Sequence, residues 1–408
     1  MTIGVPRAQR NLILALLCVA SFAVVFNNLI ITPILPDISD DLGVRVAVAG
    51  LLVTAYAIVG GVAAIFSGPF IDRVGRKPVV VAGMSVLTVA TALSAVAPNF
   101  ALLAASRALA GLGVACLTPA VFAAVGDYFA YEERGRAMSW VISANTSASI
   151  FGVPAGALIS GLLSWRLTFA LLAGLSLVFS ALLFRKLPAD IPRRQSGSEG
   201  FRAVHHVLRD RGTLLAIFSN FLSTSYWFVF VTYMGAYFHD EFGLPKWALG
   251  GLTMAMGLGV LIGSNVGGRI SDSRGKKPVI LWSGAFCAVF IASVTTISPH
   301  EIVGVAFIFL FATAGGARFA SAQAITSELS PSRRGTVMAL NASGQQFGIV
   351  AGSTIGALTL SVFGYTGLGP AAAVVALLSV VTYALCVDER RFEPNPQPEL
   401  QLAPGSKV

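Results

Sequence analysis

The chain has 408 residues, of which 55% are hydrophobic and only 12% are charged. A soluble protein carries about 25% charged residues, so this composition, together with a mean hydropathy of +0.77, excludes a soluble globular protein. The formal net charge of +9 does not indicate a nucleic-acid partner, because no basic patch with interleaved aromatic residues stands on a hydrophilic domain.

Twelve apolar runs follow one another along the chain. About twenty apolar residues cross the roughly 30 Å hydrocarbon core of a bilayer. A lipid-exposed backbone must satisfy its own hydrogen bonds, so we expect twelve transmembrane helices. The alternating pattern of a membrane β-barrel is absent. The predicted spans are residues 11–34, 47–70, 78–98, 101–125, 136–160, 167–184, 212–238, 247–270, 278–298, 302–326, 336–362 and 366–386.

The basic residues predict how these spans are oriented. If the N-terminus lies in the cytoplasm, most of the 28 lysines and arginines fall in cytoplasmic segments, as the positive-inside rule requires. We therefore expect a multi-pass protein of the cell inner (cytoplasmic) membrane with both termini in the cytoplasm. Orientation and attraction to anionic membrane lipid then explain the net charge.

One long hydrophilic connection divides the chain into halves. It has the composition of a flexible linker, and within it Phe201, Val204 and Leu208 have the spacing of a short helix on the membrane surface. The polar, proline-containing tail is expected to be disordered. The predicted units are an N-terminal six-helix bundle, a cytoplasmic linker, a C-terminal six-helix bundle and a disordered tail, over residues 1–190, 191–211, 212–390 and 391–408.

A short charged segment occurs twice in the chain. Residues 68–78 return two hundred positions later as residues 268–278, with glycine, aspartate, glycine, a basic residue and proline at the same spacing. The same offset relates Arg134 to Arg334, and the pair Gly152 and Gly156 to Gly352 and Gly356. A repeat of half the chain indicates a duplicated six-helix membrane unit, which is typical of a transporter rather than an enzyme.

The residue types in the repeated segment suit a tight turn at the membrane surface. Gly68 lets a helix end approach a neighbour closely, and Gly75, like Gly275, permits a turn that a side chain would oppose. Pro78 suits the first turn of the next helix. The alternative is that the segment, with Arg73 and Arg76, only anchors the topology.

Two arginines lie within predicted spans. Each costs about 2.5–3.5 kcal/mol to insert, so Arg107 and Arg318 are expected to face a bundle interior or a wet cavity. For Arg107 a structural role and a transport role are both open. Arg318 has Thr118 at its repeat-related position, and a charge that is not repeated favours substrate binding over a scaffold role.

Other polar and aromatic side chains within the spans are candidates for the substrate site or for contacts between helices. Aromatic residues at helical spacing are more often packing residues than ligand contacts. The candidates for substrate binding are Asn27, Asn28, Asn220, Thr224, Trp227, Gln345 and Arg318, and those for coupling or for lining a cavity are Arg107, Thr118, Asn145 and Asn341.

Acidic residues and histidines are absent from the middle of the predicted spans. No proton carrier is therefore evident. We expect no metal site in the spans, because the four cysteines lie within apolar runs and are not expected to be ligands. An intramembrane enzyme would need a nucleophile–base pair at depth, and ATP would need a glycine-rich phosphate loop. We expect neither an enzyme nor a cofactor.

Three segments carry a resemblance to a known family. Residues 68–78 resemble a signature of the major facilitator superfamily, and Arg107-Ala-Leu-Ala-Gly111-Leu-Gly113 resembles a second. Gly152-Val-Pro154-Ala-Gly156 resembles the motif of its twelve-helix drug–proton antiporter branch. The resemblance covers essentially the whole chain.

The resemblance implies two pseudo-symmetric six-helix bundles that alternate access to a site between them. It also implies a conformational latch, in which Asp72 faces the eleventh helix near Arg334, and Asp272 faces the fifth helix near Arg134. Such contacts form while the cytoplasmic mouth is closed, where a carboxylate near a helix N-terminus gains about 0.3–1 kcal/mol.

The function that the resemblance implies is secondary active export of small amphipathic compounds by a monomer, with protons as the exchanged ion. Asn27 and Asn28 stand near the place where many drug–proton antiporters carry an acid. The alternative is a gradient-independent or anion-selective carrier of an organic anion or lipid-like substrate, centred on Arg318.

Overall fold

The structure is a computed structural model that describes residues 7–129, 131–188, 209–298, 300–328 and 334–386. Every regular element in these ranges is a helix, and twelve helical stretches among them are long and apolar enough to cross a membrane. The predicted helical class and the predicted number of spans are therefore confirmed. The predicted surface helix of the linker and the predicted disordered tail lie outside the described residues.

The elements of the two halves follow the same plan. The N-terminal bundle consists of α1 (Arg7–Leu29), α2 (Ile31–Leu42), α3 (Val46–Ala49), α4 (Leu51–Val74), α5 (Arg76–Ala95), α6 (Phe100–Tyr128), α7 (Tyr131–Ser147), the π-helical turn η1 (Ala148–Gly152), α8 (Val153–Leu162) and α9 (Trp165–Lys186). The C-terminal bundle consists of α11 (Arg211–Val231), α12 (Met234–Phe242), η2 (Lys246–Ala248), α13 (Gly250–Arg274), α14 (Lys276–Thr296), α15 (Glu301–Glu328), α16 (Arg334–Phe363), η4 (Tyr365–Gly367) and α17 (Leu368–Cys386).

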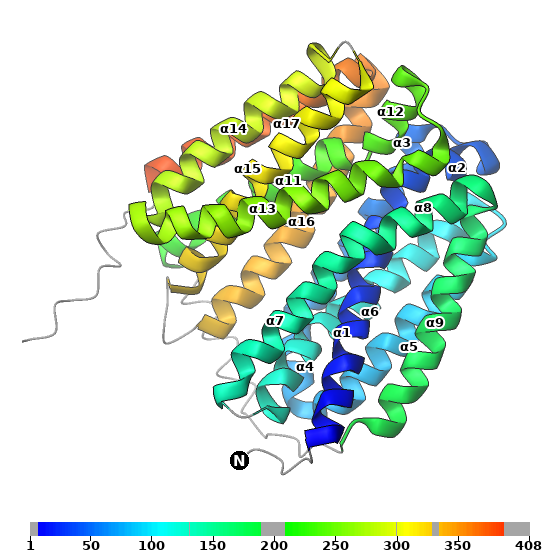
Figure 1. Ribbon diagram of the computed structural model, residues 1–408, viewed down its shortest axis with the longest axis vertical. Helices are drawn as coiled ribbons and strands as arrows, with labels where there is room; N and C mark the ends of the chain where they lie inside the picture. The colour runs from blue at the N-terminus through cyan, green and yellow to red at the C-terminus, as the bar shows by residue number, and fades with distance from the viewer. Residues whose placement is uncertain (1–6, 130, 189–208, 299, 329–333, 387–408) are drawn as a thin grey trace, which may run out of the picture.

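The two bundles lean together at one end of the molecule (Figure 1). There α2 and α8 lie beside α12 and the first turns of α13, and we call this the closed end. At the opposite end the last turn of α13 lies well away from the first turn of α7. We call this the open end.

The helical region that begins with the first span extends further than the sequence predicts. The predicted span ends at residue 34, whereas the structure has α1 ending at Leu29 and α2 continuing to Leu42. Pro33 has no N–H to bond the carbonyl of Leu29, which explains the break between α1 and α2. The consequence is that Asp37 and the acids after it belong to a helix rather than to a loop.

Both copies of the repeated segment contain a one-residue joint between helices. Gly75 lies between α4 and α5 with φ +100° and ψ +164°, and Gly275 lies between α13 and α14 with φ +89° and ψ +153°. Only glycine adopts this backbone region readily. The predicted role of glycine at these turns is confirmed, and Pro78 lies in the first turn of α5 as expected.

Glycines also allow neighbouring helices to approach closely in both halves. An added Cβ at Gly152 would lie 2.6 Å from Phe22 of α1, and one at Gly156 would lie 2.6 Å from Ile30. In the other half, a Cβ at Gly352 would lie 2.2 Å from the carbonyl oxygen of Ser225 on α11. The helix 5 motif, in which Pro154 is the second residue of α8, is thus a packing surface for the first span.

Candidate functional site

Arg107 lies in the interior of the N-terminal bundle. Its guanidinium donates hydrogen bonds to Oδ1 and to the backbone oxygen of Asn27, at 2.6 and 2.7 Å. The ring centres of Tyr56 and Phe169 lie 5.0 and 5.9 Å from it, within reach of cation–π attraction. Asn27 in turn donates to Oγ1 of Thr91 at 2.8 Å. One bundle therefore provides the whole environment of this charge.

Arg318 lies on α15 in the interior of the C-terminal bundle. Its Nε donates to Oγ of Ser223 at 3.0 Å, and one terminal nitrogen donates to the backbone oxygen of Ile280 at 2.9 Å. The other terminal nitrogen donates to Oγ of Ser219 at 3.1 Å and to Oγ of Ser379 at 2.5 Å. The guanidinium thereby joins α15 to α11, α14 and α17.

Neither guanidinium reaches the boundary between the bundles in this conformation. Arg107 and Arg318 are each 1% exposed, and the acceptors that they bind belong to their own bundles. This geometry is that of a structural residue, which was one of the two roles open for Arg107. The substrate-binding role of Arg318 stays a prediction.

Two more of the predicted substrate and cavity residues contact each other inside the C-terminal bundle. Nδ2 of Asn220 on α11 donates to Oδ1 of Asn341 on α16 at 2.8 Å and to Oγ1 of Thr326 on α15 at 3.0 Å. Nδ2 of Asn341 donates to Oε1 of Gln323 at 2.8 Å. These bonds connect three helices, and both asparagines are buried.

Asn28 and Asn145 have a different environment. Each has a buried side-chain oxygen that accepts no hydrogen bond from the described residues. Asn28 comes one helical turn before Thr32, whose carbonyl oxygen faces Gly235 of the C-terminal bundle, and Asn145 comes one turn before Ser149, which faces Gly257. The break between α1 and α2 and the π-helical turn η1 interrupt the regular helical period between each asparagine and that neighbour.

The remaining polar and aromatic candidates pack within their own helices and bundles or are half-buried. Thr224 donates to the backbone oxygen of Asn220 at 3.1 Å. Trp227 stacks on Phe311 with ring centres 4.7 Å apart. Thr118 on α6 and Gln345 on α16 are half-buried.

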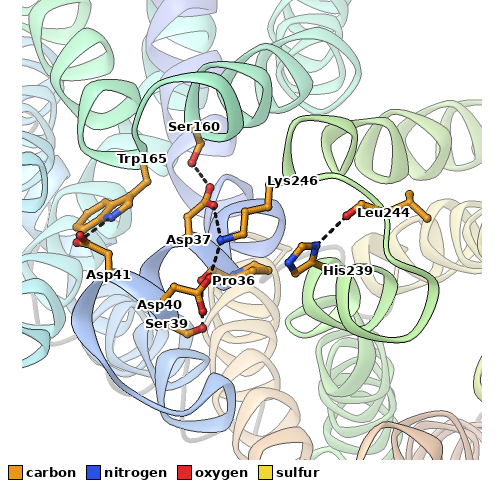
Figure 2. A network of polar contacts seen from close by, with 10 residues as sticks. All are labelled: Pro36, Asp37, Ser39, Asp40, Asp41, Ser160, Trp165, His239, Leu244 and Lys246. Atoms are coloured by element: carbon orange, nitrogen blue, oxygen red, sulfur yellow. Dashed lines mark hydrogen bonds and ion pairs between the residues drawn. The ribbon is translucent and has the colours of Figure 1, made fainter.

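A charged cluster joins the two bundles at the closed end (Figure 2). Nζ of Lys246, at the start of η2, lies 3.3 Å from Oδ1 of Asp37 and 2.6 Å from Oδ2 of Asp40, both on α2. Asp37 also accepts a hydrogen bond from Ser160 of α8. We call Asp37, Asp40, Ser160 and Lys246 the Lys246 cluster. The next acid, Asp41, instead accepts hydrogen bonds from Trp165 and Arg166 of its own bundle.

The Lys246 cluster was not predicted from the sequence, because the predicted first span ends at residue 34. The available signal was the spacing of apolar residues beyond that point. Ile34, Leu35, Ile38 and Leu42 continue a helical period past Pro36. This pattern places Asp37 on a helix, although it does not identify the lysine that it meets.

The hydrogen bonds that cross between the bundles, among the residues that the structure describes, run from the closed end to about the middle of the spans. Oγ1 of Thr54 on α4 lies 2.7 Å from Oγ of Ser353 on α16, and Ser343 donates to the backbone oxygen of Gly61 at 3.0 Å. Tyr233 donates to the backbone oxygen of Ala47 at 3.5 Å. The helices α4 and α16 thus form one side of the contact between bundles.

Comparison with known proteins identifies the family. The model of the Major Facilitator Superfamily matches residues 17–309 and 258–407. This chain belongs to the Major Facilitator Superfamily. As a member of that superfamily it is a transporter and not an enzyme, and the resemblance predicted from the sequence is confirmed.

Individual relatives of this superfamily member agree with that assignment. The chain is 27% identical over 375 residues to the uncharacterized MFS-type transporter YwfA of Bacillus subtilis (strain 168), covering 91% of each chain. It is 25% identical to a chloramphenicol resistance protein of Streptomyces lividans, covering 85% of this chain and 90% of the relative. Its fold is similar to the inward-facing crystal structure of a bacterial homolog of the human lysosomal transporter Spinster, with a TM-score of 0.77, 15% identity, and coverage of 95% and 98%.

The predicted latch residues of this superfamily transporter lie at the open end. Nε of Arg76 donates to Oδ2 of Asp127 at 3.0 Å within the N-terminal bundle. Asp272 and Arg73 are exposed, and Nε of Arg134 donates to the backbone oxygen of Phe129 at 3.1 Å.

Other parts of the latch lie outside the description. Nothing is described of the side chains of Asp72 and Arg334 or of the surroundings of Gly68. The latch belongs to the conformation in which the open end is shut, and it stays a prediction.

Proposed function

We propose that this transporter exports small amphipathic compounds by alternating access, in exchange for protons. The observation that carries the proposal is the distribution of contacts between the bundles. Described hydrogen bonds and ion pairs join the bundles from the closed end to mid-span, while at the open end the last turn of α13 lies well away from the first turn of α7 (Figure 1). One pair of bundles with contacts at one end has the geometry of a single-access state.

The sidedness follows from the charges. Basic residues are concentrated at the open end, beside Gly75 and Gly275, and the positive-inside rule assigns that end to the cytoplasm. In this proposal the structure is the inward-facing state of the cycle. The Lys246 cluster then has to separate each time the transporter opens outward.

The direction of transport and the substrate class draw support from relatives. A chloramphenicol resistance protein and a multidrug resistance protein are similar to this chain over 85% and 81% of its length. The buried side-chain oxygens of Asn28 and Asn145, which have no described partner, are hydrogen-bond acceptors. Neutral compounds with one or a few donor groups suit such amides better than permanent anions do.

The Lys246 cluster supplies a candidate for proton coupling. The Asp37 carboxylate is 13% exposed and is held by Lys246 of the other bundle. Separation of the bundles would remove Lys246 and admit water to this carboxylate. We propose Asp37 as the group that takes up a proton from the outside.

The alternative carrier, selective for organic anions and centred on Arg318, receives less support. The Arg318 guanidinium is held by four hydrogen bonds inside one bundle. An anion would have to replace those bonds to bind there.

The test uses purified transporter in proteoliposomes with labelled chloramphenicol, followed by a panel of neutral, cationic and anionic amphipathic compounds. A pH gradient should drive accumulation by the native chain. Asp37→Asn should abolish the response to the gradient and keep exchange of substrate without a gradient. Asp41→Asn is the matched control, because Asp41 lies one turn further along the same helix and pairs within its own bundle.

Two results would overturn the coupling proposal. One is gradient-driven accumulation that survives Asp37→Asn, and the other is an equal loss in Asp41→Asn. Transport of organic anions alone, lost in Arg318→Met but retained in Asp37→Asn, would favour the alternative carrier.

The role of Lys246 in holding the closed end is measured separately. Partly exposed ion pairs contribute about 0.2–1 kcal/mol each, and Lys246 forms two of them, so Lys246→Ala should raise the outward-open population up to about thirtyfold. The measurement is the rate at which a maleimide modifies Thr54→Cys in a background without native cysteines, since Thr54 lies at the contact between bundles. An unchanged rate would show that the cluster does not hold the bundles together.

A further inference from the structure

The ring of Tyr233, in the C-terminal bundle, fits into a gap at Gly50 of the N-terminal bundle. Tyr233 stands at the break between α11 and α12, and Gly50 is the residue before α4. An added Cβ at Gly50 would lie 2.2 Å from the phenolic oxygen of Tyr233 and 2.3 Å from its ring carbon Cε1. A side chain at residue 50 would therefore occupy the place of the ring.

The contacts of Tyr233 are stronger with its own bundle than with the other. Its hydroxyl donates to the backbone oxygen of Ser353 at 2.9 Å, whereas the backbone oxygen of Ala47 in the N-terminal bundle is 3.5 Å away. An added Cβ at Gly356, also in the C-terminal bundle, would lie 2.6 Å from Cε2, on the other edge of the ring. When the bundles separate, the ring therefore stays with the C-terminal bundle and leaves the gap at Gly50 empty.

The sequence repeat supplies the reciprocal contact. Gly250 stands two hundred positions after Gly50 and is the first residue of α13. An added Cβ at Gly250 would lie 2.6 Å from Cα and 2.9 Å from the backbone oxygen of Pro154, which belongs to α8 of the N-terminal bundle. Each bundle thus has a glycine at the same position of the repeat, and each glycine receives a part of the other bundle. We call Gly50 and Gly250 the socket glycines.

The socket glycines act between the bundles rather than within them. The three atoms nearest to an added Cβ belong to Tyr233 for Gly50, and to Pro154 and Ala157 for Gly250, so in both cases they come from the opposite bundle. Both glycines lie at the closed end, where the first turns of α13 lie beside α8 (Figure 1). A larger side chain at either position should oppose closure of the bundles, but it leaves the listed contacts within each bundle in place.

We propose that the socket glycines form the gate at the closed end of this transporter. The gate is shut when Tyr233 fills the space at Gly50 and Pro154 fills the space at Gly250, and it opens when both spaces are vacated together. This inference rests on the proposed function only for alternating access. It does not depend on the substrate, on the direction of transport or on proton coupling.

The experiment measures how often the gate opens. Ser353 is a suitable reporter position, because it is 0% exposed in this conformation and lies across the boundary from Thr54. Ser353→Cys is placed in the full-length chain after replacement of the native cysteines by alanine. A membrane-impermeant maleimide is applied to bacterial spheroplasts, where it reaches the outer face, and to inside-out vesicles, where it reaches the cytoplasmic face. Size-exclusion chromatography in detergent measures the folded fraction of every variant.

We expect Gly50→Leu and Gly250→Leu each to raise the labelling rate in spheroplasts by about ten- to hundredfold, because the new side chain prevents closure. The folded fraction should stay that of the native chain. Combining Gly50→Leu with Tyr233→Ala should return the rate toward its original value, since the overlapping ring is gone. Gly251→Leu is the matched control, because it is the next residue on α13 and a Cβ there meets nothing within 4 Å. It should leave the labelling rate unchanged.

Three outcomes would overturn the proposal. The first is an unchanged labelling rate in folded Gly50→Leu and Gly250→Leu. The second is a raised rate in Gly50→Leu that Tyr233→Ala does not lower. The third is a loss of folded protein in Gly50→Leu that Tyr233→Ala does not restore, which would assign the glycine to folding. A raised rate in inside-out vesicles instead of spheroplasts would support the gate but overturn the inward-facing state of the proposed function.

Discussion

In the N-terminal bundle, α6 approaches α4 at Gly111, where an added Cβ would lie 2.0 Å from the carbonyl oxygen of Tyr56. In the C-terminal bundle, the equivalent pair of helices meets at Gly263 of α13, where a Cβ would lie 1.8 Å from the carbonyl oxygen of Thr313. Both contacts require glycine, and in the C-terminal pair α15 contributes one as well, because a Cβ at Gly316 would lie 2.4 Å from the carbonyl oxygen of Val260. The two halves therefore share the close approach of these helices, although glycines at different positions allow it.

The polar interiors of the two bundles differ more. Arg107 binds one asparagine and lies beside two aromatic rings, whereas Arg318 binds three serine hydroxyls and a backbone oxygen. The two arginines also stand at positions that the repeat does not relate. The two bundles thus share close helix contacts, whereas each surrounds its buried charge with a different set of partners.

The largest expected effect is on the glycine contacts. Gly111→Leu and Gly263→Leu should each prevent formation of the folded transporter, because the new side chain would overlap backbone atoms that cannot move independently. Size-exclusion chromatography in detergent measures the folded fraction. Gly174→Leu and Gly251→Leu are controls, since a Cβ at either position meets nothing within 4 Å. If only one of the two leucine variants folded, the glycine contacts in the two bundles would not be equivalent.

A smaller effect is expected at the one-residue joints. Gly75→Ala and Gly275→Ala should each lower the free energy of unfolding by about 1–3 kcal/mol, because both glycines adopt a backbone conformation that alanine disfavours. Thermal unfolding of the two variants checks this. A much larger loss in one of them would show that the two copies of the segment are not mechanically equivalent.

The smallest expected difference concerns the arginines. Hydrogen bonds between membrane helices contribute about 0.6 kcal/mol on average, so Arg318→Met, which removes four, should destabilise the fold by about 1 kcal/mol more than Arg107→Met, which removes two. Unfolding temperature and transport are measured for both. If Arg318→Met abolishes transport without changing stability, Arg318 binds the substrate, and its interpretation as a structural residue is wrong.

Features encoded by local pattern could be predicted from the sequence. Apolar length located the twelve spans, and the spacing around Gly75 and Gly275 indicated tight turns that the structure confirms. The end of the first span could not be placed, since Pro33, Pro36 and three aspartates resemble a loop. Local pattern alone does not reveal that a second helix, α2, follows α1 and extends to Leu42.

The candidate site depended on information that the sequence does not contain. Whether Arg318 faces a cavity or its own bundle depends on the rotation of α15 about its axis and on serines from two other helices. The contact of Asp37 with Lys246 joins residues of opposite halves, and a single sequence gives no measure of such pairing. Residue type alone makes Asn28 and Asn145 candidates, but only the structure shows that their side-chain oxygens have no described hydrogen-bond partner.

The partial exposure of the Lys246 cluster has one more consequence. The side chains of Lys246 and Asp40 are 27% and 68% exposed, so dissolved ions reach them, and the screening length falls from about 8 Å at physiological ionic strength to about 3 Å at 1 M. Concentrated salt added to one face of a sealed vesicle should weaken the ion pairs of the Lys246 cluster only in those molecules whose closed end lies at that face. The response to salt on one side therefore shows which way each reconstituted molecule is inserted.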